Sequence, residues 1–262
     1  MQNPVIKAVF FDIDGTLLSF KTHKVATSTE QAIAKLKAKG IKCILSTGRS
    51  INSIDHVKYL EFDGFITFNG GYCVTKEGNL LFKQTIDAAD IQSIMNYAKA
   101  QSLSFSFMSE KQISIHDGTP EIAGMYAHLN LPVPENIDFD TIDVSSVLQT
   151  NIFMGPAEEE DFMQKVMPNS SASRWSQLFA DVNPKGQSKK IGIDVFCKYF
   201  NIDINETMAF GDGGNDIEML QHVAVGVAMG NANPEVKAIA NYVTDDVDSD
   251  GIWNALTHFK VL

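Results

Sequence analysis

The sequence has few cysteines, few positive charges and no long apolar run. Its three cysteines, Cys43, Cys73 and Cys197, stand far apart, and an odd number at wide spacing fits neither a disulfide framework nor a zinc site. We expect them to be reduced and packed as small apolar groups. No segment approaches the roughly 18 consecutive apolar residues of a membrane helix. The short apolar run at residues 9–11 meets Asp12 at once, unlike a signal peptide. We therefore expect a cytoplasmic protein that has no membrane partner.

Positive charge is scarce relative to negative charge. The chain has 21 lysines and arginines against 32 aspartates and glutamates, for a formal net charge of −11. This balance argues against a nucleic-acid partner, because phosphate backbones attract basic surfaces. A small phosphorylated substrate remains compatible, since one positive pocket can lie inside an acidic protein. We expect a small-molecule phosphate ester as the partner, and a monomer or weak homo-oligomer.

The first part of the chain alternates strand and helix signals, which indicates a doubly wound parallel sheet, that is, an α/β core of the Rossmann-like kind. Near-continuous apolar runs are typical of strands buried on both faces. In the first expected helix, Thr27 and Glu30 can form a capping box, and Gly40 ends the helix. We expect strands at residues 5–11, 41–45 and 65–68, a helix at 27–39, and another helix after residue 49.

The middle of the chain has shorter and more polar strand signals mixed with helices, as in residues 104–108 beside 112–116. We interpret it as a separate α+β domain inserted into the first. The expected division is residues 1–80 for the first part of the core, 81–184 for the inserted domain and 185–262 for the second part of the core. In that last part we expect helices at 188–200 and from 216, near 234 and near 251, and strands at 207–211 and 223–228.

Two polar motifs follow the first two expected strands. Asp12 and Asp14, which Gly15 and Thr16 follow, place two carboxylates just beyond a buried strand. This arrangement is costly unless a cation binds both carboxylates. Magnesium suits hard oxygen ligands, although an ordinary acidic turn has the same composition. The second motif, residues 46–49, contains Thr47 at a strand end that enters a helix, which suits a phosphate. A plain helix cap is the alternative interpretation.

Two further motifs lie in the last part of the chain. Lys189 is close to Lys185 and Lys190, so a solvated basic surface is the ordinary interpretation of this lysine. Residues 211–216 again carry two carboxylates, Asp212 and Asp216, among glycines after a buried strand. This last motif matches neither a dinucleotide fingerprint nor a P-loop, and a calcium-like loop or a capped turn remains open.

Together the four motifs predict a phosphoryl-transfer site. In an open α/β sheet the carboxyl ends of the strands form the ligand-binding edge. A cation there offsets the carboxylates, while the lysine, the hydroxyl and the backbone amides face an anion. Positioning and charge neutralisation are the main requirements of phosphoryl transfer.

In this order the motifs resemble those of the haloacid dehalogenase-like hydrolases. Asn69-Gly70 after the third strand, the inserted domain and the sequence of residues 211–220 resemble the Cof-type branch, which has a large α/β cap domain. The resemblance covers essentially the whole chain, and the first and fourth motifs are the most specific. Lys190 departs from the branch, where glycine is common.

The resemblance implies a magnesium-dependent phosphatase that acts on small metabolites such as hexose phosphates through an aspartyl phosphate. Asp12 would be the nucleophile and Asp14 the general acid and base. The other roles that the resemblance implies are phosphate binding by Thr47, Gly48, Lys189 and Asn215, Mg²⁺ binding by Asp12, Asp14 (through its backbone carbonyl) and Asp212, and support by Asp216 and Arg49.

Three cap residues, Arg174, Trp175 and Phe179, are candidates for substrate contacts, with packing within the cap as the alternative. Phe105, Phe107 and Met108 are expected in the core of the inserted domain. Three other functions use similar residues: a phosphomutase, a response-regulator receiver and a non-catalytic sugar-phosphate-binding protein. The receiver would be about half as long, and binding alone would not require the acid and base at residue 14.

Overall fold

The computed structural model describes residues 4–128, 132–139, 141–174 and 177–262. The chain forms two compact units. The core unit comprises Met1–Arg49, Ile54–Lys83 and Ser188–Leu262, and the inserted unit comprises Ser50–Ser53 and Gln84–Gln187. The strand β5 (Leu80–Lys83) belongs to the core sheet, so this sheet extends three residues beyond the boundary expected after residue 80.

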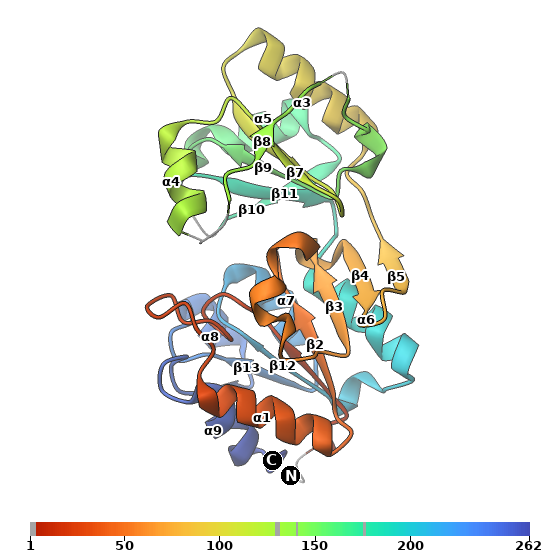
Figure 1. Cartoon of the computed structure of the whole chain (residues 1–262), viewed down its shortest axis with the longest axis vertical. Coiled ribbons are helices and arrows are strands. Elements are labelled where there is room, and N and C mark those ends of the chain that lie inside the picture. Colours follow the sequence, from red (N-terminus) through yellow and green to blue (C-terminus); the bar gives the residue numbers. More distant parts are fainter. Residues whose placement is uncertain (1–3, 129–131, 140, 175–176) are drawn as a thin grey trace. The chain divides into compact units, whose positions relative to one another are not determined.

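The core unit is built on an eight-stranded sheet in the order β14-β13-β12-β1-β2-β3-β4-β5 (Figure 1). The six strands from β14 to β3 in this order are parallel, as expected, and β4 and β5 are antiparallel additions. Asn69 and Gly70, with φ of 51° and 99°, reverse the chain after β3, a conformation that glycine and asparagine adopt most readily. The other strands are β1 (Ala8–Phe11), β2 (Lys42–Ser46), β3 (Gly64–Thr67), β4 (Tyr72–Thr75), β12 (Thr207–Gly211), β13 (Val225–Ala228) and β14 (Tyr242–Val243).

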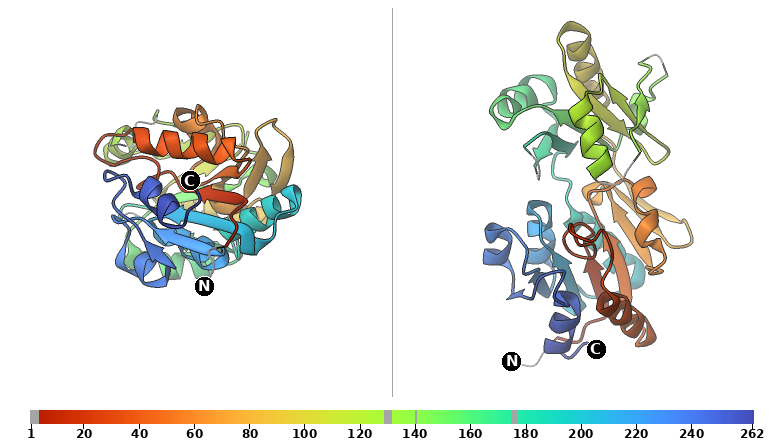
Figure 2. Two further views of the ribbon diagram at one scale, coloured as in Figure 1. Left: turned by 90° about the horizontal axis from the view of Figure 1, so that it is seen from below. Right: turned by 60° about the vertical axis from the view of Figure 1, so that its left-hand side comes forward.

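Both faces of β1 are buried. Ala8 and Phe10 belong to a cluster with Ile193 of α6 (Lys189–Phe200). Side chains alternate along a strand, so Phe11 points to the opposite face, where its ring stacks on Phe210 with centroids 5.5 Å apart. Figure 2 shows α1 (Thr27–Ala38) and α6 on opposite sides of this sheet. The remaining core helices are α2 (Asp55–Lys58), α7 (Ile217–His222), α8 (Pro234–Ile239) and α9 (Gly251–His258).

One local prediction about helices is wrong, and one expected helix is short. The N-cap of α1 is Ala26, which has no side-chain cap, so the expected capping box of Thr27 and Glu30 does not form. Burial of Ile33 and Leu36 positions α1 instead. The helix expected after residue 49 is present as a 3₁₀ turn, Ile51–Ser53, followed by the four-residue α2, whose Val57 is buried.

The inserted unit has a six-stranded sheet in the order β10-β11-β9-β6-β7-β8. Phe105 and Phe107 are buried in its core, as expected, and Met108 is buried as well. None of the helices in the described ranges combines the length and apolar character needed to cross a membrane. The strands are β6 (Ser104–Met108), β7 (Ile113–His116), β8 (Glu135–Asn136), β9 (Gln149–Phe153), β10 (Ser170–Ser173) and β11 (Ala180–Pro184), and the helices are α3 (Ala88–Ala100), α4 (Pro120–His128) and α5 (Pro156–Val166).

Candidate active site

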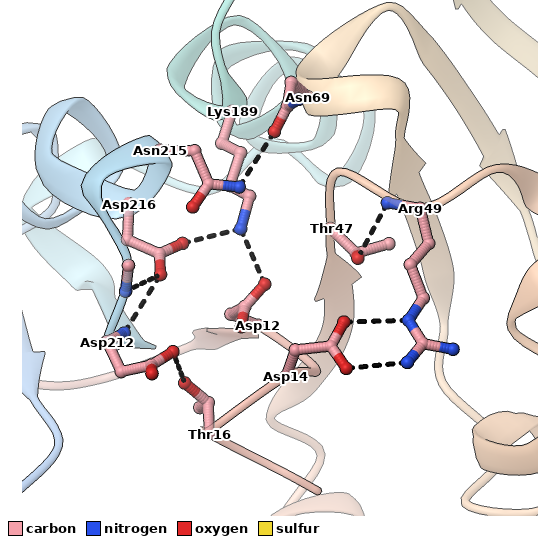
Figure 3. A network of polar contacts seen from close by, with 11 residues as sticks. Asp12, Asp14, Thr16, Thr47, Arg49, Asn69, Lys189, Asp212, Asn215 and Asp216 are labelled. Carbon is pink, nitrogen blue, oxygen red and sulfur yellow. Dashed lines mark hydrogen bonds and ion pairs between the residues drawn. The ribbon is translucent and has the colours of Figure 1, made fainter. Parts of the chain in front are cut away.

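The predicted site residues come from separate loops of the core unit and meet at the carboxyl edge of its sheet (Figure 3). Lys189 joins the first and fourth motifs, because its Nζ lies 2.6 Å from Oδ1 of Asp12 and 2.6 Å from Oδ1 of Asp216. The carboxyl ends of neighbouring parallel strands lie on one edge. Lys189 and Asp12, almost 180 positions apart in the sequence, therefore lie within hydrogen-bonding distance.

Lys189 is fully buried, so its interpretation as part of a solvated basic surface is wrong. Lys185 and Lys190, its neighbours in sequence, are exposed. Two glycines explain the difference, because they let the start of α6 lie against the sheet. A Cβ on Gly70 would lie 2.1 Å from the Ser188 carbonyl oxygen, and one on Gly192 would lie 2.4 Å from Ile66. The first residue of α6 is thereby placed inside the site.

The two oxygens of Asp216 are bound by different parts of the site. Oδ1 accepts from Lys189, and Oδ2 accepts from the backbone N–H groups of Asp212 and Gly213 at 2.9 and 3.0 Å. A Cβ on Gly211 would lie 2.5 Å from the Asp216 carboxyl carbon, so the glycine permits this folded-back loop. Asp216 therefore fixes the backbone that carries Asp212.

Three carboxylates crowd together here. One oxygen each of Asp12, Asp212 and Asp216 lies within 4.8 Å of the others. Burial raises the pKa of Asp12 to about 7 against the opposing effect of Lys189, with a further upward contribution from Asp216. Burial, Asp12 and Asp216 together raise the pKa of Asp212 to about 8. Hard oxygen donors with excess negative charge fit a divalent cation such as Mg²⁺. The Asp14 side chain lies outside this group.

Asp14 is held by Arg49 in a two-pronged ion pair, with Nε and Nη2 of the arginine on opposite carboxylate oxygens. Nη1 of Arg49 lies 3.5 Å from Nε2 of His56 on α2. Burial, together with the charge of Arg49, lowers the pKa of His56. Neutral imidazole can accept from Arg49 through Nε2, so His56 supports the position of the arginine.

The second motif lies beside the turn after β3. Thr47 is buried, and its Oγ1 accepts from the Arg49 N–H at 3.1 Å. Asn215 donates to Oδ1 of Asn69 at 3.0 Å. A Cβ on Gly48 would lie 3.0 Å from that same oxygen. The helix expected directly after this motif begins as a 3₁₀ turn, and α2 starts only at Asp55. An anion bound here would face backbone amides without the dipole of a long helix.

Sequence reasoning missed two contributors, His56 and Asn231, and left two others, Thr16 and Asn69, without a role. Thr16 donates to Oδ1 of Asp212 at 3.3 Å. Asn69, quoted only for its resemblance to the family, contacts Asn215. His56 gave no local signal. Asn231 follows β13 at the same sheet edge and donates to the Gly15 carbonyl at 2.7 Å. The strand-end rule that located the four motifs could have located Asn231 as well.

The cap candidates have packing roles where the structure describes them. Arg174 pairs with Glu159 of α5 and donates from Nη2 to the Met154 carbonyl at 2.7 Å. Phe179 is buried, with its ring centroid 5.8 Å from that of Phe153. Trp175 lies outside the described residues.

Comparison with known proteins agrees with this geometry. Residues 9–256 match the model of a family described as haloacid dehalogenase-like hydrolase. The curated protein "Putative phosphatase YkrA" of Bacillus subtilis (strain 168) is 32% identical over 259 residues, which is 98% of either chain.

Two solved structures are similar throughout. The phosphatase BT1666 from Bacteroides thetaiotaomicron superposes with a TM-score of 0.91 at 36% identity, covering 98% of this chain and 96% of that one. The HAD subclass IIB sugar phosphatase BT4131 gives 0.90 at 38% identity, covering 98% and 100%. With a Rossmann-like core, an inserted cap and the four motifs at one sheet edge, this chain belongs to the haloacid dehalogenase-like hydrolases, among the Cof-type phosphatases that act on phosphate monoesters.

Proposed function

We propose that the protein hydrolyses sugar phosphates, hexose phosphates in particular, with Mg²⁺ and through an aspartyl-phosphate intermediate on Asp12. The observation that carries this proposal is the uncommitted oxygen of Asp12. Oδ1 accepts from Lys189, whereas Oδ2 has no hydrogen-bond partner among the residues that the structure describes. Both oxygens of Asp14 and of Asp216 are already bound. Asp12 is thus the carboxylate that can attack phosphorus.

In this proposal Asp12 Oδ2 forms a bond to phosphorus while the bond from phosphorus to the leaving oxygen breaks. Asp14 gives its proton to that leaving oxygen. It then takes a proton from water, which attacks the phosphorus and releases inorganic phosphate from Asp12. Asp14 lies two residues beyond the nucleophile and is partly exposed, so its carboxyl group can reach a leaving group on the solvent side.

Four residues would hold the phosphoryl oxygens: Thr47 and Asn215 by their side chains, Gly48 by its backbone N–H, and Lys189 by its charge. Mg²⁺ would be held by Asp12, the Asp14 carbonyl and Asp212, where it would neutralise charge that develops on the phosphoryl group. Asp216 would keep Asp212 in place through the two backbone N–H bonds.

The substrate class rests on likeness. The similar structure of BT4131 is described as a sugar phosphatase, and a hydroxyl-rich leaving group gives Asp14 an alkoxide oxygen that needs a proton. A good leaving group such as p-nitrophenolate would not need one.

The test is phosphate release from a panel of sugar phosphates, nucleotides and phosphorylated acids, with Mg²⁺ or with chelator. We expect turnover only with Mg²⁺, its loss in Asp12→Asn, and the highest kcat/KM for hexose phosphates. Asp63→Asn is a matched control. Its carboxylate binds Lys42 and the Cys43 N–H just before β3, away from the carboxyl edge of the sheet, so the variant should stay active.

Asp14→Asn separates the two steps. With p-nitrophenyl phosphate we expect a burst of one p-nitrophenolate per enzyme, because the first step needs no acid and the second lacks its base. Mass spectrometry should then find phosphate on the peptide that contains Asp12. Transfer of phosphate between two positions of a sugar, without net release, would instead identify a mutase.

A further inference from the structure

Asn231 connects three loops at the active-site edge. Its Nδ2 donates to the Gly15 carbonyl at 2.7 Å and lies 3.4 Å from Oδ2 of Asp212. Its Oδ1 accepts from the Val247 N–H at 3.0 Å. One side chain therefore links the loop after β1, the loop after β12 and the segment before α9.

The Val247 bond determines which way the amide faces. A backbone N–H can only donate, so it requires the amide oxygen of Asn231 and turns the NH₂ group toward Gly15 and Asp212. The backbone around Asn231 is also fixed, because the Gly230 N–H donates to the Asp245 carbonyl at 2.9 Å. A Cβ on Gly230 would lie 2.5 Å from the Asp246 nitrogen. Asn231 is consequently held in one orientation before any ligand arrives.

The position of Asp212 depends on contacts of this kind. A Cβ on Gly15 would lie 2.1 Å from Oδ2 of Asp212, so the Asp212 side chain lies directly against the backbone of Gly15. Thr16 binds the other oxygen of Asp212. Without Asn231, Oδ2 would lose its only hydrogen-bond donor among the described residues, and the Gly15 carbonyl, next to the Asp14 carbonyl in the chain, would lose its own.

We infer that Asn231 is a positioning residue for the metal site: it sets the distance between the loop of Asp14 and the carboxylate of Asp212, and so determines how strongly the protein binds Mg²⁺. This inference rests on the proposed function, which places Mg²⁺ between these two loops. Groups that orient metal ligands in this way typically change metal affinity by roughly 10–100-fold when removed.

The experiment is calorimetric titration of the substrate-free protein with Mg²⁺. We expect Asn231→Ala to raise the dissociation constant roughly 10–100-fold. Asn241→Ala is the matched control, because the Asn241 side chain also caps a backbone N–H, that of Gly226 at 2.7 Å, near the amino end of β13. Asn241→Ala should lower the melting temperature about as much as Asn231→Ala does, and it should leave the affinity for Mg²⁺ unchanged.

Two results would overturn the inference in different ways. Equal Mg²⁺ affinity of the wild type and Asn231→Ala would show that Asn231 only caps a loop, and would leave the proposed function intact. Failure of the wild type itself to bind Mg²⁺ would remove the metal from the proposed function and this inference with it. If Asn231→Ala does not fold, Asn231→Ser takes its place, since a serine hydroxyl is too short to reach both loops.

Discussion

Arg49 donates one hydrogen bond to each carboxylate oxygen of Asp14: Nε lies 2.8 Å from Oδ2, and Nη2 lies 2.6 Å from Oδ1. The planar guanidinium group matches the plane of the carboxylate, so this pair fixes direction as well as charge. Only 13% of the arginine side chain is exposed, so solvent screening of the pair is limited. The orientation of Asp14 therefore depends on the shape of residue 49.

Arg49→Lys keeps the charge but cannot form two parallel bonds. We expect kcat for a hexose phosphate to fall about 10–100-fold, less than the roughly 10²–10⁴-fold contribution of a general acid, because Asp14 itself remains in place. The effect on p-nitrophenyl phosphate should be much smaller, because its leaving group departs without a proton. Steady-state kinetics on both substrates would measure this difference. Arg174→Lys, which alters the other arginine of the chain at its pair with Glu159, is the control. An equal loss on both substrates would contradict a role through Asp14.

Lys189→Met should destabilise the metal-free protein. Removing the buried ammonium leaves Asp12 and Asp216 without their cation, and breaking a buried ion pair in this way costs about 3–5 kcal/mol. Urea unfolding in the presence of chelator would measure the loss. Lys190→Met removes an exposed neighbour on the same helix and should change the free energy of unfolding by less than about 0.5 kcal/mol. Similar values for the two variants would rule out a stabilising role for the buried cluster.

The parallel core could be predicted from the sequence because the core strands are buried on both faces, and because a polar motif follows the carboxyl end of several of these strands. The strand predicted at residues 207–211 matches β12, and the four motifs meet at one edge. The antiparallel strands β4 and β5 were not predicted, and β5 is only partly buried.

The depth of Lys189 could not be read from its neighbours in sequence. Its burial follows from the approach of α6 to the turn at Gly70, a contact between residues more than a hundred positions apart. Asn231 and His56 depend on tertiary contacts in the same way, whereas the expected capping box of α1 failed because the local pattern allows a cap without requiring one.

The metal-free protein should lose stability as pH rises. Asp12 and Asp212 have pKa values of about 7 and about 8 in the folded state, against 3.8 for an unperturbed aspartate. At any pH between the unperturbed pKa and the folded-state pKa of these groups, the folded state binds more protons than the unfolded state. The free energy of unfolding therefore falls with increasing pH. The contribution is complete below about pH 4 and lost above about pH 8.

Thermal unfolding with chelator between about pH 5 and pH 9 would reveal this slope. Mg²⁺ should flatten it at the alkaline end, because the cation replaces the protons. Asp212→Asn should make the chelated slope shallower by removing one titrating group. A slope that is the same with and without Mg²⁺ would mean that the carboxylates are not the groups responsible.

Ser46 carries a buried hydroxyl group without a hydrogen-bond partner in the described part of the chain. An unsatisfied buried polar group costs about 1–3 kcal/mol, so Ser46→Ala should leave the free energy of unfolding unchanged or raise it by about 1 kcal/mol. Thr244→Val is the matched control, because the Thr244 hydroxyl is also buried but donates to the Gly251 carbonyl at 2.7 Å. That variant should lose about 1 kcal/mol. Urea unfolding of both would separate the two cases, and a loss in Ser46→Ala as large as in Thr244→Val would show that the Ser46 hydroxyl has a partner, such as a buried water molecule, that stabilises the fold.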